Sequence, residues 1–266
     1  MANIKIAIWN KSSLLDDPTV SAALPALQTQ IHRDFAPVWG VDADLAFVSK
    51  NDQPAAGSWW LVVLDDSDVA GDLGYHELTD EGLPLGYVFA RTDQQAGLKW
   101  TVTASHELLE MLGDPDINLY AFVQTGNNTG NFYSYEVCDP CELDEQGYQI
   151  DGVQVSDFVY PPWFEGFRTQ GSTQFDYRKL IDQPFKLLPG GYSSLLDIPS
   201  GLGWYQIDMP APQGAHARRL QAPLGSRRER RSRARNQWVR SIPKEVNAPG
   251  GENSTVARGS RRKSKH

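Results

Sequence analysis

The sequence predicts a mixed α/β fold, in which helices cover a sheet. Apolar runs of strand length and segments of helical periodicity follow one another in the order strand, helix, strand, strand, strand, helix. Of the 266 residues, 40% are hydrophobic and 11% are aromatic, so the chain can supply a sizeable core. No apolar run approaches the ~20 residues that a membrane-spanning helix needs, and we expect no contact with a membrane.

The first strand and the first helix have clear local signals. Residues 4–8 alternate as a strand does, and Asp17 followed by Pro18 provides an N-cap and a first-turn proline. Pro25 should kink this helix or mark its true start, because proline has no amide hydrogen to donate. One apolar stripe continues along the helix through Val20, Leu24, Leu27, Ile31 and Phe35.

Three further apolar runs have strand length, and a longer segment has the length and composition of a helix. A polar, glycine-rich loop precedes the last of the three runs. His76 lies in this loop, and we expect it to be a surface residue rather than a metal ligand. The strands are expected at residues 43–48, 59–64 and 85–90, and the helix at residues 98–112.

The charges divide the chain into an acidic body and a basic tail. Residues 213–266 hold 15 of the 25 Lys+Arg and 3 of the 33 Asp+Glu, so they carry +12 and the rest carries −20. Because the tail is poor in apolar residues, we expect a folded domain over residues 1–212 followed by a disordered tail. Its basic stretch, 218–265, predicts non-specific binding to nucleic acid or another polyanion. The alternative is a solubilising extension, or one that folds back on the acidic body.

The residues that carry chemistry are concentrated in the second predicted helix. Residues i and i+4 of a helix lie one above the other, so His106 and Glu110 can present a nitrogen and a carboxylate oxygen to one metal ion. Glu107 points about 100° around the axis, where it can act as the general base toward bound water. The alternative is an ordinary helix with a solvated polar face and a buried leucine face.

The pattern His106-Glu107-x-x-Glu110 resembles the His-Glu-x-x-His active-site helix of the zincin metallopeptidases, with glutamate in place of the second histidine. The strand at 85–90 and the helix stop at Gly113-Asp114-Pro115 fit this resemblance. It implies a zincin-like mixed sheet. In small zincins, the last strand before the active-site helix is the sheet edge that holds an extended peptide by strand addition.

A third metal ligand must come from outside this helix. Glu136 lies 26 residues past Glu110, a separation similar to that of zincins with a downstream glutamate ligand, and we prefer it. Asp116 is the alternative, because a longer zincin motif closes its site with an aspartate ten residues after the first histidine. Asp139 can accept a hydrogen bond from the metal-binding histidine, and Tyr135 is a candidate donor to a developing oxyanion.

Two further resemblances include this region. His106-Glu107-Leu108-x-Glu110 followed by Glu136-x-x-Asp139-x-Cys141 is similar to the phosphate-induced, Exordium-like proteins of plants, over about 40 residues. The match departs at Cys138, which stands where those proteins have glycine. Uncharacterised bacterial proteins with a Tyr-Glu-Val-Cys-Asp segment and a later Ser-Asp-Phe-Val strand resemble most of the acidic body, and they imply no particular activity.

Cys138 and Cys141 are the only cysteines, and one such pair is half of a four-cysteine zinc site. We therefore expect a tight disulfide, a reduced pair or simple packing. The N-terminus lacks a charged segment followed by a long apolar one, which predicts a cytoplasmic protein with free thiols. Export by a non-Sec route is compatible with this pattern.

Together these features predict a metal-dependent hydrolase, a zinc metallopeptidase acting on a peptide or protein. The metal would be bound by His106, by Glu110 and by either Glu136 or Asp116, and Glu107 would be the general base. Because carboxylates neutralise more of the metal charge than imidazoles do, Mn²⁺ and Fe²⁺ are alternatives to Zn²⁺. The rival is a non-catalytic, zincin-like binding or assembly module, in which a fourth protein ligand closes the metal site.

Overall fold

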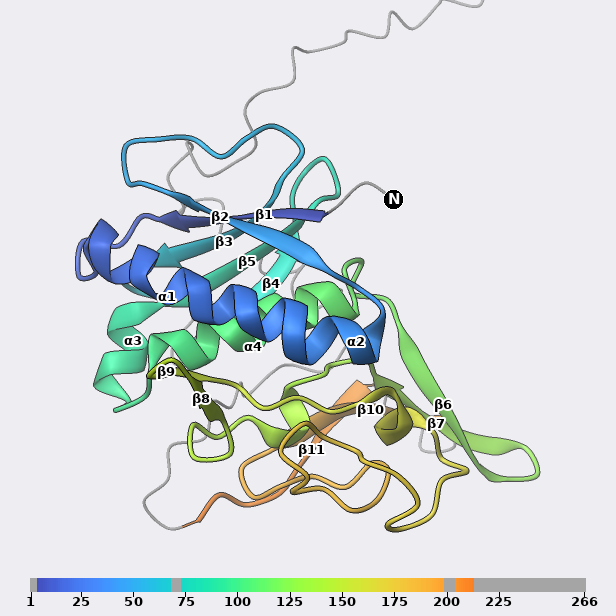
Figure 1. The fold of residues 1–266 in the computed structure, drawn as a ribbon. Coiled ribbons are helices and arrows are strands. Elements are labelled where there is room, and N and C mark those ends of the chain that lie inside the picture. Colours follow the sequence, from blue (N-terminus) through green and yellow to red (C-terminus); the bar gives the residue numbers. More distant parts are fainter. Residues whose placement is uncertain (1–3, 68–72, 199–203, 213–266) are drawn as a thin grey trace, which may run out of the picture.

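The computed structural model describes residues 4–67, 73–198 and 204–212, and it confirms the mixed α/β class (Figure 1). A five-stranded sheet has the order β2-β1-β3-β5-β4. The first four strands in this order are parallel, and β4 runs antiparallel to β5. The strands are β1 (Ile4–Asn10), β2 (Ala43–Val48), β3 (Trp59–Leu64), β4 (Gly74–Leu78) and β5 (Pro84–Phe89).

Two long helices, α1 (Asp17–Thr29) and α4 (Trp100–Gly113), lie against one face of this sheet (Figure 1). Alternate residues of the central strands face these helices and the others face the opposite side, and β5 is buried along its whole length. The opposite face carries an aromatic cluster in which Trp9 meets Trp60 edge-on, with ring centroids 5.7 Å apart. Both faces of the sheet are therefore filled, and the helix-covered face holds the polar residues described below.

The first helix begins one residue away from the predicted cap. The side chain of Asp16, rather than that of Asp17, accepts a hydrogen bond from the amide of Thr19. Pro25 lies inside α1, so it does not mark the start of the helix. A π-helical segment, Gln30–Phe35, and the short α2 (Ala36–Trp39) continue in the same direction.

The polar loop predicted before the last strand contains β4, and this corrects two expectations. Gly82, with φ of 83°, reverses the chain between β4 and β5, so the two strands form a hairpin. The last strand before the long helix is therefore an inner strand, and β4 takes the edge position. His76 is not a surface residue of a loop: it lies in β4 and has no exposed area.

The second half of the chain forms smaller elements that the sequence reading did not predict. A four-stranded antiparallel sheet has the order β11-β10-β7-β6, and β8 and β9 form a separate hairpin. The elements of this half are β6 (Tyr120–Gly126), β7 (Thr129–Ser134), β8 (Tyr148–Ile150), β9 (Val153–Val155), β10 (Tyr192–Asp197), β11 (Trp204–Asp208) and two 3-10 turns, Asp139–Cys141 and Pro161–Phe164. A short helix, α3 (Ala90–Gln95), lies earlier in the chain, between β5 and α4.

Within the described residues, no helix is long and apolar enough to cross a membrane. The predicted disordered tail, residues 213–266, and its polyanion-binding stretch, 218–265, lie outside the described residues. Cys138 and Cys141 are buried free thiols rather than a disulfide, and burial raises the pKa of both well above the usual value. They are therefore protonated and inert packing groups.

Asp157 and Asp176 form a buried pair of acids that holds the chain around residues 157–158 and 176–181. The amides of Leu180 and Ile181 each donate to one oxygen of Asp176, and the amide of Phe158 donates to Asp157. Burial, together with the charge of Asp176, raises the pKa of Asp157 well above the usual value. In the folded protein Asp157 therefore keeps a proton that the unfolded chain releases near pH 3.8. Because the folded state then binds more protons than the unfolded state, the free energy of unfolding falls as the pH rises above that value.

We expect Asp157→Asn to raise the free energy of unfolding at pH 8 by about 1 kcal/mol and to flatten this pH dependence. The amide keeps the acceptor oxygen and replaces the shared proton by a permanent donor to Asp176. Denaturant titrations at pH 5 and pH 8 measure the effect. Asp176→Asn is the control and should destabilise, because its nitrogen cannot accept a backbone amide. Destabilisation by Asp157→Asn at pH 8 would contradict the pairing.

Candidate metal centre

The residues of the predicted metal motif point into the protein. His106 and Glu107 are only 5% and 4% exposed, and Glu110 is fully buried. Between Val102 and Leu112 the helix is buried all round, whereas a solvated polar face would leave charged side chains in water. Burying a carboxylate is costly unless it is paired or binds a cation, so these groups need partners.

The first set of partners lies after β7. His106 Nε2 is 3.3 Å from Glu110 Oε1, as the i, i+4 spacing predicts, and 3.2 Å from Asp139 Oδ1. Asp139 begins a 3-10 turn, and the amide of Cys138 just before it donates to Glu110 Oε1 at 3.4 Å. One ligand atom from each of His106, Glu110 and Asp139 lies within 4.8 Å of the others, close enough to bind one metal ion.

A second set of partners comes from the sheet edge. His76, Glu110 and Glu136 also bring one ligand atom each to within 4.8 Å of the others. His76 Nδ1 is 3.7 Å from Glu110 Oε2 and 3.1 Å from Glu107 Oε2. Glu136, the preferred third ligand, therefore lies with Glu110 as expected, but the histidine nearest to it comes from β4.

We refer to these residues together as the carboxylate–histidine cluster. Its members share almost complete burial, with exposed fractions between 0% and 5%. They come from β4, from α4 and from the segment that follows β7. The cluster consists of His76, His106, Glu107, Glu110, Glu136 and Asp139.

Glycines let the helix approach the sheet closely enough to form the cluster. A Cβ atom at Gly74 in β4 would lie 2.7 Å from the Tyr87 carbonyl oxygen and 3.1 Å from Glu107 Oε1. At Gly86 in β5, a Cβ would lie 2.8 Å from the sulfur of Met111. Larger residues at either position would push α4 away from β4 and so separate His76 from the carboxylates of the helix.

The other two predicted site residues lie elsewhere. Asp116 is exposed after the end of α4 and belongs to neither metal-binding group of the described residues. The ring of Tyr135 stacks on Phe164, with centroids 4.0 Å apart, and burial, together with the charge of Glu165, raises the pKa of its hydroxyl. A different tyrosine reaches the cluster, because the hydroxyl of Tyr192 at the start of β10 forms a hydrogen bond with Asp139.

The electrostatics of the cluster show how strongly the groups interact. Burial and the charge of Glu110 raise the pKa of Asp139 to about 7. Although burial opposes it, the carboxylates of Glu110 and Asp139 raise the pKa of His106 well above the usual value. Burial would raise the pKa of Glu107, but the hydrogen bond from His76 and the charge of His106 hold it below the usual value. Bound protons thus neutralise part of the negative charge of these carboxylates. A divalent cation would neutralise it better.

The donor set fits a divalent transition metal. Imidazole nitrogen and carboxylate oxygen are ligands that Zn²⁺, Mn²⁺ and Fe²⁺ accept in proteins. Asp139 Oδ1 faces His106 Nε2 at 3.2 Å without hydrogen-bond geometry, which is how two ligands of one ion meet. Buried His, Glu and Asp groups of this protein can therefore hold a metal ion, whose identity the geometry does not select.

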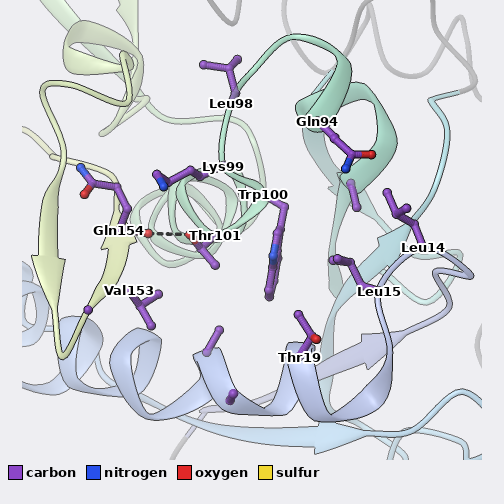
Figure 2. Close-up of a pocket in the computed structure, with 14 residues that line it drawn as sticks. Leu14, Leu15, Thr19, Gln94, Leu98, Lys99, Trp100, Thr101, Val153 and Gln154 are labelled. Atoms are coloured by element: carbon purple, nitrogen blue, oxygen red, sulfur yellow. Dashed lines mark hydrogen bonds between the residues drawn. The ribbon is translucent and has the colours of Figure 1, made fainter.

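A cavity of about 550 Å³ lies at the other end of α4 and is separate from the cluster (Figure 2). Trp100 stands above α1, between the start of α4 and the segment with Leu14 and Leu15, and the hydroxyl of Thr101 donates to the carbonyl of Gln154 at 2.7 Å. None of its lining residues belongs to the carboxylate–histidine cluster.

The chain matches no protein-family model, no curated protein and no solved structure. The buried cluster is therefore the observation on which its function has to be argued.

We expect the affinity for Zn²⁺ to fall as the pH decreases from 7.5 to 5.5. Metal ligands must lose their protons, and Asp139, with a pKa of about 7, and His106 both hold protons in this range. The loss should be about tenfold per pH unit for each proton displaced. Competition with a chromophoric chelator measures it, and Asp139→Asn should reduce the slope. An affinity that does not vary with pH would contradict the assignment of Asp139 as a ligand.

Proposed function

We propose that the protein is a metal-dependent hydrolase whose substrate is an extended peptide. The observation that supports this most directly is the position of Glu107. Its carboxylate belongs to neither of the two metal-binding groups but lies beside both, hydrogen-bonded to His76 at 3.1 Å. A carboxylate held ionised next to metal ligands is suited to be a general base.

The chain's own residues supply the proton transfers. A bound divalent cation would polarise a substrate carbonyl and favour ionisation of water. Glu107 then accepts a proton from the attacking water and returns it to the leaving amine. The hydrogen bond from His76 orients the Glu107 carboxylate and keeps it ionised, while the hydroxyl of Tyr192 positions Asp139.

The sheet edge supports a peptide as the substrate. Among the described strands, β4 is one of the two edge strands of the five-stranded sheet, β2 being the other, and β4 carries His76. A peptide that adds as a further strand to β4 would run alongside the cluster. His106 and Glu107, the ligand and the base that the reaction needs, are the cluster members with the largest exposed fractions, 5% and 4%.

A second candidate is a non-catalytic module in which metal binding stabilises the fold. The specific observation in its favour is burial, because structural metal sites are closed by protein ligands whereas catalytic sites keep an open position. His76 and Glu110 have no exposed area, and Glu136 and Asp139 are each only 3% exposed. In this alternative the cluster links α4, β4 and the segment after β7 and has no substrate.

We expect Glu107→Gln to lower the rate of peptide hydrolysis by about 10²–10⁴-fold, the usual contribution of a general base. Metal content should stay unchanged, since Glu107 belongs to neither metal-binding group. A quenched-fluorescence peptide library assayed with the zinc-loaded protein measures the rate, and mass spectrometry measures the metal.

The matched control is Asp116→Asn, which removes an exposed carboxylate near the same helix and should leave the rate unchanged. Full activity in Glu107→Gln would contradict the mechanism. A wild-type protein that is loaded with metal but cleaves no peptide in the library would favour the non-catalytic module.

A further inference from the structure

Glu110 belongs to both metal-binding groups, and its two oxygens turn toward different histidines. Oε1 lies 3.3 Å from His106 Nε2, whereas Oε2 lies 3.7 Å from Nδ1 of His76. A carboxylate that presents one oxygen to each of two neighbouring sites has the geometry of a bridging ligand. Pairs of ions bridged in this way lie about 3.5–4 Å apart in two-metal sites.

The remaining ligands divide evenly between the two sides. The first group adds Asp139 to His106, and the second adds Glu136 to His76, so each side has one imidazole and one carboxylate of its own. These four residues come from three separate parts of the chain, namely β4, α4 and the segment after β7. Neither group is a fragment of the other, since only Glu110 is shared.

The charge of the cluster also matches two cations rather than one. Four carboxylates, Glu107, Glu110, Glu136 and Asp139, carry four negative charges when ionised, and neutral imidazoles carry none. One divalent cation would leave two of these buried charges to be compensated by protons, whereas two divalent cations would cancel all four. Uncompensated charge is what a protein interior tolerates least.

We propose that the centre is dinuclear: Glu110 bridges two divalent cations, one bound by His106 and Asp139 and the other by His76 and Glu136. This inference rests on the proposed metal-dependent function, because it assumes that the cluster binds metal, and it adds the number of ions and the role of each ligand. Ligands of this kind, rich in carboxylate, suit Mn²⁺ and Fe²⁺ as well as Zn²⁺.

The test is the metal stoichiometry of the full-length, untagged chain. After equilibration with Mn²⁺ and removal of free ions by gel filtration, mass spectrometry should find two ions per chain. Electron paramagnetic resonance of the same sample should show a spin-coupled signal instead of the six-line spectrum of an isolated Mn²⁺. The control Asp116→Asn, which removes an exposed carboxylate, should keep both ions and the coupling.

Single substitutions of the ligands test the two metal sites individually. Glu136→Gln and Asp139→Asn should each keep one ion and lose the coupling, while Glu110→Ala should lose the coupling and weaken both sites. Circular dichroism identifies variants that fail to fold. If Glu110→Ala is unfolded, the near-isosteric variants Glu136→Gln and Asp139→Asn still test the proposal.

The two hypotheses fail in different ways. One ion per wild-type chain with an uncoupled spectrum would overturn the dinuclear centre and leave metal binding intact. No bound ion in the wild type would overturn the metal-dependent function as well. Two ions that persist unchanged in both Glu136→Gln and Asp139→Asn would show that the ions lie elsewhere, and this would overturn the assignment of the ligands.

Discussion

Electrostatic repulsion among four buried carboxylates is the constraint around which this structure is built. Glu107 and Glu110 on α4 meet Glu136 and Asp139 in a region where each is at most 4% exposed. Ionised groups in such surroundings need protons or cations nearby. The two histidines compensate part of the negative charge. The raised pKa of Asp139 shows that they do not compensate all of it. A fold would not retain this arrangement for stability alone, since apolar residues of the same size would pack without the cost.

The rest of the fold brings these groups together. Small residues on β4 and β5 let α4 lie close to the sheet edge, so that His76 reaches the helix. On the other side, Gly113 meets the side chain of Val137, and the amide of Cys138 donates to Glu110. Tyr192 of the second sheet adds a hydrogen bond to Asp139. Two sheets and one helix thus converge on the same cluster, and a metal ion there would link them.

Sequence reasoning found the part of the site whose members are close in the chain. The i, i+4 spacing on a helix brings His106 and Glu110 to 3.3 Å, and a short segment that begins 26 residues after Glu110 contains Glu136 and Asp139. His76 was missed because its strand is short and polar. The signal that could have found it is the hairpin pattern, in which a turn containing Gly82 separates two runs of strand length. Tyr192 had no such signal, since only tertiary packing brings β10 to Asp139.

The most direct test of the central claim is anomalous X-ray diffraction from crystals equilibrated with Zn²⁺. The account predicts anomalous density inside the cluster, at bonding distance of about 2.0–2.2 Å from the carboxylate oxygens of Glu110. Density confined to exposed acidic residues such as Asp116, with none beside Glu110, would contradict it. In that case the cluster would be a proton-sharing structural element, and the proposed hydrolase would have no metal centre.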